Sequence, residues 1–333
     1  MAVKLLPRIL PRILAVGALS LGPLLMGAVP TPPAPLAPGA QLFEGRRFEE
    51  ARKFFEAYAA RSPRDADAAL YLGRTYLGLR KTDPAVEWLE KAAALAPASS
   101  EKQLWLGRGY GAAALNANLF SAAGLAKKAK AAFDKAVALD PANLDARDDL
   151  ILFHLQAPGF MGGSVDKARE EAAEIRKRDA VRGRVALARI LLQQKDAAGA
   201  ERELKAAVQE SPANPRGRLS LGQLYASQER WNDAFDAFEA LLKADPDNWD
   251  ALYQLGRTGA VSGQRLDRAA ECLKRYVGHT PGSQEAPPAN AHFRLGMVYE
   301  KKGDKPRARA EYQEAVRLDP SLEDAKKALA KVK

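Results

Sequence analysis

Cysteine and histidine are nearly absent from this 333-residue chain, which holds one cysteine and three histidines. An intramolecular disulfide or a cysteine-rich metal site needs at least two cysteines in the chain, so the presence of Cys272 alone excludes both. It lies in a helix-forming stretch with no charged or metal-binding pattern around it, and we expect it to be a packing residue. His154 lies in an apolar stretch and is expected to pack as well. The other two histidines of the chain are His279 and His292.

No motif of known catalytic spacing is present. The chain lacks HExxH and GxSxG, its histidines are far apart in the sequence, and no pair of acids stands out from a generally charged surface. The glycines at 159, 162 and 163 are not followed by the Lys-Ser/Thr of a phosphate-binding loop, and no strand pattern precedes them. We therefore expect no enzyme, no catalytic residue, no metal and no cofactor.

A long run of one charge sign is also missing. The net charge is +10, but acids and bases are interspersed and no Lys/Arg run has the length of a nucleic-acid-binding tail. Acidic partners are mildly favoured and nucleic acid is not expected. With 47% apolar and 28% charged residues, abundant alanine and few β-branched runs, the composition favours a folded helical protein.

The first 42 residues differ from the rest. Residues 1–12 carry basic side chains and no acid, and residues 13–29 form an uncharged apolar run of 17, as in a signal peptide. We expect residues 1–29 to be a signal peptide, which places the protein in the periplasm or exports it, or an N-terminal membrane anchor if the imperfect cleavage sites are not used. Residues 30–42 are rich in proline and predict an extended spacer.

Beyond residue 42 a pattern of small, aromatic and proline residues recurs with a period of 34 residues. It consists of Leu72, Gly73, Tyr76, Ala85, Leu89, Ala92 and Pro97, and it returns from Leu221 to Pro246 and from Leu295 to Pro320. This pattern resembles the tetratricopeptide repeat (TPR), a pair of antiparallel helices. Glycine and alanine let the two backbones approach, the larger residues fill the gap, and the proline follows the second helix.

The resemblance covers about 285 residues and implies an all-α fold, an α-solenoid of antiparallel helix hairpins that winds as a right-handed superhelix. We expect a TPR array over residues 43–333. Its parts are a half repeat at 43–65, whose missing partner we expect around Leu42, repeats at 66–99, 100–143, 144–180, 181–214, 215–248, 249–283 and 289–320, and a C-terminal capping helix at 321–333.

The resemblance also implies a concave groove lined by the second, fifth, ninth and twelfth places of each first helix. Arginines are frequent there, and an arginine can bind a carboxylate with two parallel hydrogen bonds. The candidate groove residues are Arg74, Arg108, Arg182, Arg189, Arg216, Arg257, Tyr253 and Phe293. Leu70, Leu104 and Leu219 would add apolar contacts. Acids also face the groove, so some arginines could instead pair internally with Asp67, Glu101, Asp145, Asp148 or Asp250.

Chaperone-binding members of the family hold a carboxylate with lysines at the fifth place, which this sequence lacks. The expected partner is therefore a protein or peptide of mixed character, acidic or with a free carboxylate.

Two insertions interrupt the array. About ten additional residues precede Ala129 in the second repeat, and residues 156–163 insert Phe160 and Met161 between Pro-Gly and Gly-Gly. Insertions in repeat proteins usually lie in loops on one face. The apolar pair could contact a partner, but we favour the alternative that Phe160 folds back onto the enlarged second repeat.

The sequence thus predicts a non-enzymatic TPR scaffold of the bacterial cell envelope that binds a protein or peptide segment in its groove. The alternative is an N-terminally anchored assembly or tethering factor of the envelope, which would contact the membrane only through its first residues.

Overall fold

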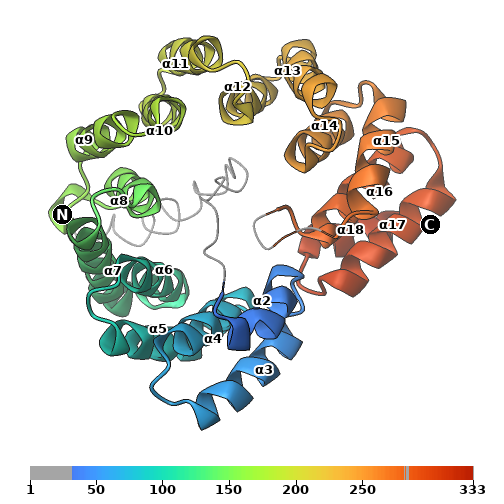
Figure 1. Cartoon of the computed structure of the whole chain (residues 1–333). Helices are drawn as coiled ribbons and strands as arrows, with labels where there is room; N and C mark the ends of the chain where they lie inside the picture. Colours follow the sequence, from blue (N-terminus) through green and yellow to red (C-terminus); the bar gives the residue numbers. More distant parts are fainter. Residues whose placement is uncertain (1–31, 281, 283–284, 333) are drawn as a thin grey trace, which may run out of the picture. The chain divides into compact units, whose positions relative to one another are not determined.

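The structure, a computed structural model, describes residues 32–280, 282 and 285–332. This part of the chain contains helices and no strand, which confirms the predicted all-α fold of helix hairpins. The expected signal peptide or anchor at 1–29 lies outside the described residues. The described chain divides into two compact units, one that ends at Asp196 and one that begins at Ala197, and within each unit consecutive helices alternate in direction (Figure 1).

The first unit contains a short N-terminal pair of helices, three helix hairpins and one further helix at its end. Its elements are η2 (Ala34–Leu36), α2 (Ala37–Glu44), α3 (Phe48–Arg61), α4 (Ala66–Gly78), α5 (Thr82–Leu95), α6 (Ser100–Asn116), α7 (Leu119–Leu139), α8 (Leu144–Gln156), η3 (Gly159–Met161), α9 (Val165–Arg176) and α10 (Ala180–Gln193). The helix α10 is the first half of the predicted repeat 181–214.

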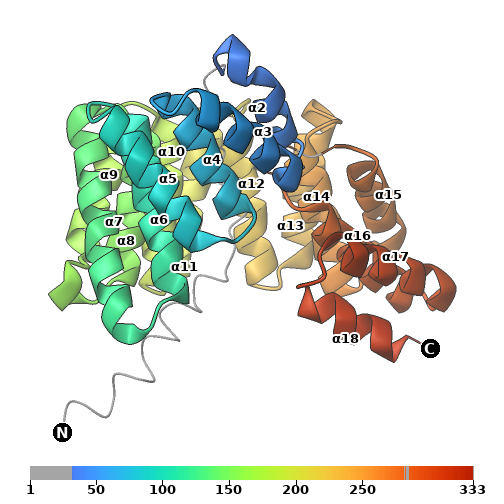
Figure 2. The ribbon, with the colours of Figure 1, turned by 90° about the horizontal axis from the view of Figure 1, so that it is seen from below.

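The second unit contains the remaining hairpins. Its elements are α11 (Ala197–Glu210), α12 (Pro215–Ser227), α13 (Trp231–Ala244), α14 (Trp249–Ser262), α15 (Leu266–Val277), α16 (Pro288–Lys301), α17 (Lys305–Leu318) and α18 (Glu323–Lys331). Figure 2 shows α18 beside α17 at the end of the chain, and the two helices are in contact. Each predicted repeat from 66 to 320 contains two helices of the structure, and its first helix begins within one residue of the predicted start.

Small residues set the distance between the two helices of a hairpin. A Cβ added to Gly73 in α4 would lie 2.6 Å from Cγ of the fully buried Leu89 in α5, and one added to Gly256 in α14 would lie 2.3 Å from Cγ of Leu273 in α15. The helices therefore pack with glycine against leucine at the position where the repeat pattern predicted close approach.

Most first helices begin at a side-chain cap. Asp65, Asn143, Asp179 and Asn248 each accept a hydrogen bond from a backbone N–H in the first turn of the helix that follows. These caps satisfy donors that the helix itself leaves unpaired.

The N-terminal segment differs from the extended spacer that we expected over residues 30–42. Residues 34–44 form η2 and α2, and Leu36, Ala40 and Phe43 are buried against α3. Proline permits this because it lacks only a backbone N–H that the first turn of a helix leaves unpaired anyway. The stretch around Leu42, where we expected the missing partner of the half repeat, belongs to α2 and packs beside α3.

The insertion in the second repeat lengthens its helices. α6 has 17 residues and α7 has 21, whereas α4 and α5 of the preceding repeat have 13 and 14.

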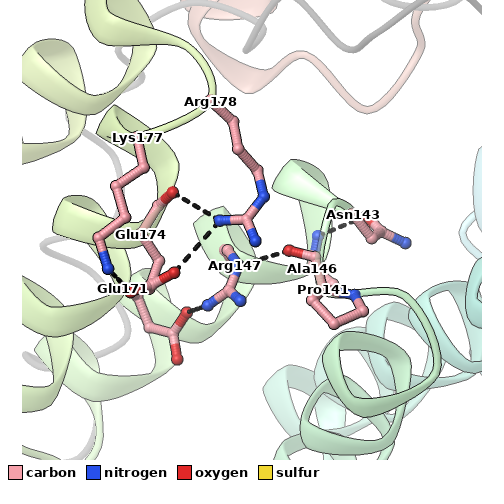
Figure 3. Close-up of polar contacts among 8 residues, drawn as sticks. All are labelled: Pro141, Asn143, Ala146, Arg147, Glu171, Glu174, Lys177 and Arg178. Carbon is pink, nitrogen blue, oxygen red and sulfur yellow. Dashed lines mark hydrogen bonds and ion pairs between the residues drawn. The ribbon is translucent and has the colours of Figure 1, made fainter.

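Ion pairs hold the α8–α9 hairpin together (Figure 3). Arg147 of α8 donates from Nε to the carbonyl oxygen of Pro141 at 3.0 Å and from Nη1 to Oε2 of Glu171 in α9 at 2.5 Å. Lys177 and Arg178 both pair with Glu174. Arg147, Lys177 and Arg178 thus have acidic partners within this hairpin.

Candidate functional site: the first-helix face

We call the side chains at the second, fifth and ninth places of the first helices the first-helix face. In the first unit these helices are α4, α6, α8 and α10, and in the second they are α12, α14 and α16. Neighbouring first helices pack side by side within a unit, α4 with α6, α8 with α10, α12 with α14 and α14 with α16. The first helices of the second unit therefore form a continuous row, whereas those of the first unit form two adjacent pairs that the ion pair of Arg108 in α6 with Asp149 in α8 connects. The two units are described separately.

Arg74 in the first unit is enclosed by aromatic rings. Its side chain is 3% exposed, and its Cζ lies 4.7 Å from the ring centre of Phe43, 5.0 Å from that of Tyr71 and 4.6 Å from that of Trp105. Glu44 is 4.0 Å away. Burial lowers the pKa of Arg74. The aromatic faces attract this cation and leave little of it for a partner.

The next three arginines of the first unit pair with aspartates. Arg108 donates from Nε to Asp149 at 2.6 Å. Arg182 donates to Asp148 at 2.6 Å and to Asp145 at 2.5 Å, and Nη1 of Arg189 lies 3.7 Å from the other oxygen of Asp148. The structure thus brings Arg182 and Arg189 together on one buried carboxylate, as in the internal pairing that the sequence left open as an alternative.

The three leucines that we expected to offer apolar contacts are buried. Leu70, Leu104 and Leu219 are less than a tenth exposed. The fifth place of a first helix is therefore a packing position in these repeats, because a leucine there is covered by its neighbours. Tyr253 and Phe293, at the fifth place of α14 and α16, remain half-buried and pack against the core of the second unit.

The second unit has arginines without acidic partners. Arg257 of α14 is half-buried and makes one long hydrogen bond, 3.5 Å from Nη1 to Oε1 of Gln254. Arg294 of α16 contacts Sδ of Met297 at 3.2 Å and the ring of Phe293 at 5.1 Å. Among the described residues, no carboxylate forms an ion pair with either guanidinium. Burial and the charge of Arg294 lower the pKa of Arg257.

Arg216 and Asp250 occupy the second place of their helices. Arg216 lies half-buried in the first turn of α12, where its backbone N–H donates to Asn214. Burial, with a contribution from the nearby charge of Glu285, raises the pKa of Asp250 to about 6. The acid of this row therefore lies two helical turns from Arg257, too far for a direct ion pair.

Sequence reasoning missed Arg294, Asp149 and Lys102. Arg294 is at the sixth place of its helix, which the repeat pattern does not assign to the face. Asp149 is one residue beyond the aspartate that we expected to face the arginines. Lys102 pairs with Asp67 at 2.6 Å across α4 and α6. The only sequence signal for these three residues is their charge. Many other charged residues of the chain carry the same signal, so it does not single them out.

We had favoured the alternative that Phe160 folds back onto the second repeat, and this expectation is wrong. The loop between α8 and α9 exposes Phe160 to solvent instead. Phe160 is 81% exposed on η3, and Met161 beside it is half-buried. His154 is buried, as expected, and its Nδ1 lies 2.9 Å from the carbonyl oxygen of Gly162, which makes it the donor to this loop. Burial lowers the pKa of His154 and so favours its neutral form. The hydrogen bond from His154 holds the loop, while Phe160 at its tip stays exposed.

The remaining candidate reactive groups are structural. Cys272 is fully buried, and burial raises the pKa of its thiol to about 12, which suits the packing role that we expected. Within the described ranges, no three His, Cys, Asp or Glu side chains are grouped so that they could bind a metal ion. In the same ranges, no helix combines the length and apolar character needed to cross a bilayer.

Comparison with known proteins agrees with the fold. Sequence models described as tetratricopeptide repeat match residues 42–104, 191–234, 219–284 and 289–322, more than half of the chain in total. The chain matches no curated protein sequence.

Several solved structures are similar. Yeast Tom70 is 15% identical with a TM-score of 0.64, over 96% of this chain and 68% of that one. A monomeric mutant of IFIT1 with Gppp-AAAA is 17% identical with a TM-score of 0.53, over 88% and 69%. A tetratricopeptide repeat protein from Parabacteroides merdae is 14% identical with a TM-score of 0.47, over 80% and 97%. At these identities the likeness concerns the fold alone.

Proposed function

Because the chain belongs to the tetratricopeptide repeat family, whose arrays serve as protein interaction scaffolds, we propose that it binds a protein or peptide segment on its first-helix face and catalyses no reaction. The observation that carries this proposal is the composition of that face in the second unit. There Tyr253, Phe293 and Met297 are partly exposed beside arginines that lack acidic partners.

Aromatic side chains and arginine contribute most of the binding energy in protein interfaces. The second helices of the same unit differ, because their larger apolar side chains are buried toward the hairpin partner and their exposed charges are largely paired. Arg268, for example, holds Glu239 at 2.9 and 3.0 Å. Unsatisfied cations and accessible rings thus occur together on the first helices, where a partner would gain most.

A site-specific photo-crosslinker in the full chain, expressed in its native cells, tests the proposal. We expect the same partner protein to be crosslinked from Gln223 and Met297 on the first-helix face. The matched positions Lys243 and Glu271, exposed on the second helices α13 and α15, should give no such adduct. Adducts that form from Lys243 and Glu271 instead, or from all four positions equally, would contradict binding on the first-helix face.

We also propose that Phe160 and Met161 add a contact to the partner, since an exposed phenylalanine on a hydrogen-bonded loop can enter an apolar pocket. A crosslinker at position 160 should then capture the protein that Gln223 captures. If position 160 gives no adduct while Gln223 does, this loop contact is wrong and the main proposal stands.

We propose that the protein acts in the bacterial cell envelope, on the strength of the basic and apolar segments in residues 1–29. Cleavage of these residues would release a scaffold in the periplasm, and retention would give an anchored assembly or tethering factor. The mature mass and the membrane or soluble fraction in which the protein is found distinguish the two. A protein that stays in the cytoplasm with its first residues intact would contradict both.

A further inference from the structure

We propose that Arg257 and Arg294 together form a carboxylate-binding site on the second unit, which holds an acidic side chain of a bound peptide segment. This inference rests on the proposed function and specifies which part of the face determines the chemistry of the partner. The two residues lie on α14 and α16, first helices that pack directly against each other.

The first argument is the difference in charge compensation between the two units. In the first unit Arg108, Arg182 and Arg189 each lie within 4 Å of an aspartate oxygen. In the described part of the second unit neither Arg257 nor Arg294 has such a partner. Partly buried guanidinium groups without a counter-ion are costly, because burial removes water and nothing replaces it. A ligand carboxylate would supply the missing charge.

The second argument is the state of the donor atoms. Nε of Arg294 is buried and donates to no acceptor among the described residues. The other contacts of this guanidinium are a thioether sulfur and an aromatic ring, both weak partners. The single bond of Arg257, at 3.5 Å, is near the limit of a hydrogen bond. Neither guanidinium therefore makes a strong hydrogen bond within the described part of the chain, and each would hold a carboxylate more strongly than these neutral partners.

The third argument is the proximity of two like charges. The positive charge of Arg294 acts on Arg257, and both side chains are half-buried, where charges are less screened than in water. A carboxylate between two cations relieves their repulsion. Tyr253, Phe293 and Met297 surround the pair with apolar surface, which suits apolar residues on either side of the acidic one.

A peptide-binding measurement on the full chain tests the site. The probe is a fluorescein-labelled, C-terminally amidated octapeptide of alternating glutamate and leucine, and its control has glutamine in place of glutamate. We expect the glutamate peptide to bind about 10-fold more tightly, as charge-assisted hydrogen bonds require. Equal affinities, or no binding of the glutamate peptide, would overturn the inference.

Two double variants locate the binding. R257Q/R294Q should lose most of the preference for glutamate and keep the weak affinity for the glutamine peptide. K305Q/R309Q removes the same charge from the exposed side of α17 and should change both affinities less than 2-fold. Equal losses in the two variants would show nonspecific attraction by the net positive charge and would overturn the inference.

A charge-swap variant distinguishes loss of the binding site from loss of the fold. R257E/R294E should prefer a lysine–leucine octapeptide to the glutamate one, a gain that a damaged fold cannot produce; continued preference for glutamate would contradict the site. A result with no glutamate preference but intact crosslinking from Gln223 refutes this inference alone. Glutamate binding at the site without crosslinks from the first-helix face refutes the proposed function.

Discussion

At the scale of single residues, the arginines of the first-helix face have three different environments. Arg74 is enclosed by aromatic rings, Arg182 and Arg189 share an aspartate, and Arg257 has no acidic partner in the described part of the chain. The same residue type therefore stabilises the fold in one repeat and remains available for binding in another. The difference depends on which acids lie within reach.

Asp148 should be the acid on which the first unit depends most. It is buried between Arg182 and Arg189, so Asp148→Asn would leave two buried cations with Asp145 as the nearest paired acid. We expect a loss of about 2–3 kcal/mol in the free energy of unfolding, measured by urea titration, because removal of one partner leaves a buried charge uncompensated. Asp236→Asn, at an exposed ion pair with Arg265, serves as the control and should leave the stability unchanged. Equal effects would refute the structural role of Asp148.

Asp250 should make the stability depend on pH. Its pKa is raised to about 6 in the folded protein, above the ordinary value of 3.8, so the folded state holds this proton more tightly than the unfolded state. Stability attributable to Asp250 is therefore present below about pH 4 and falls as the pH rises toward 6. We expect Asp250→Asn to raise the free energy of unfolding by about 1–2 kcal/mol at pH 7.5 and to leave it unchanged at pH 3.5. An unchanged stability at pH 7.5 would contradict the burial of this carboxylate.

At the scale of helices, the hairpins were predictable because each depends on local spacing. Glycine at the eighth place of α4 and the proline after α5 have positions that packing enforces, so the starts of the first helices followed from the sequence within one residue. The helix α2 did not, since its prolines suggested an extended chain and only its burial against α3 shows why a helix forms there. Likewise, Phe160 could fold inward or outward until the neighbouring side chains were known.

Two glycines in neighbouring first helices should respond oppositely to alanine. Gly73→Ala brings a Cβ to 2.6 Å from Leu89 and should destabilise by about 1–2 kcal/mol in spite of the better helix propensity. Gly111 in α6 has no atom within 4 Å of an added Cβ, and Gly111→Ala should stabilise by about 0.5–1 kcal/mol. Thermal and urea unfolding followed by circular dichroism measure both. Stabilisation by Gly73→Ala would refute the close helix contact.

At the scale of the whole chain, the sequence predicted the repeat array but not its electrostatics. The period of 34 residues recurs in several repeats and so identifies the family. An ion pair such as Arg108 with Asp149, in contrast, joins residues 41 positions apart and depends on how two side chains reach each other. The sequence for this reason predicted arginines on the first-helix face without distinguishing the paired ones from Arg257. It also left out Arg294, which the repeat pattern assigns to no face.

Hydroxyl-radical footprinting of the full chain, alone and with its crosslink-identified partner, tests binding on the first-helix face most directly. The account predicts that oxidation of Tyr253, Phe293 and Met297 slows in the complex. Leu139 and Leu318, which are exposed near the ends of α7 and α17, should react at the same rate in both samples. Slower oxidation of Leu139 and Leu318 with no change at Met297 would contradict the account.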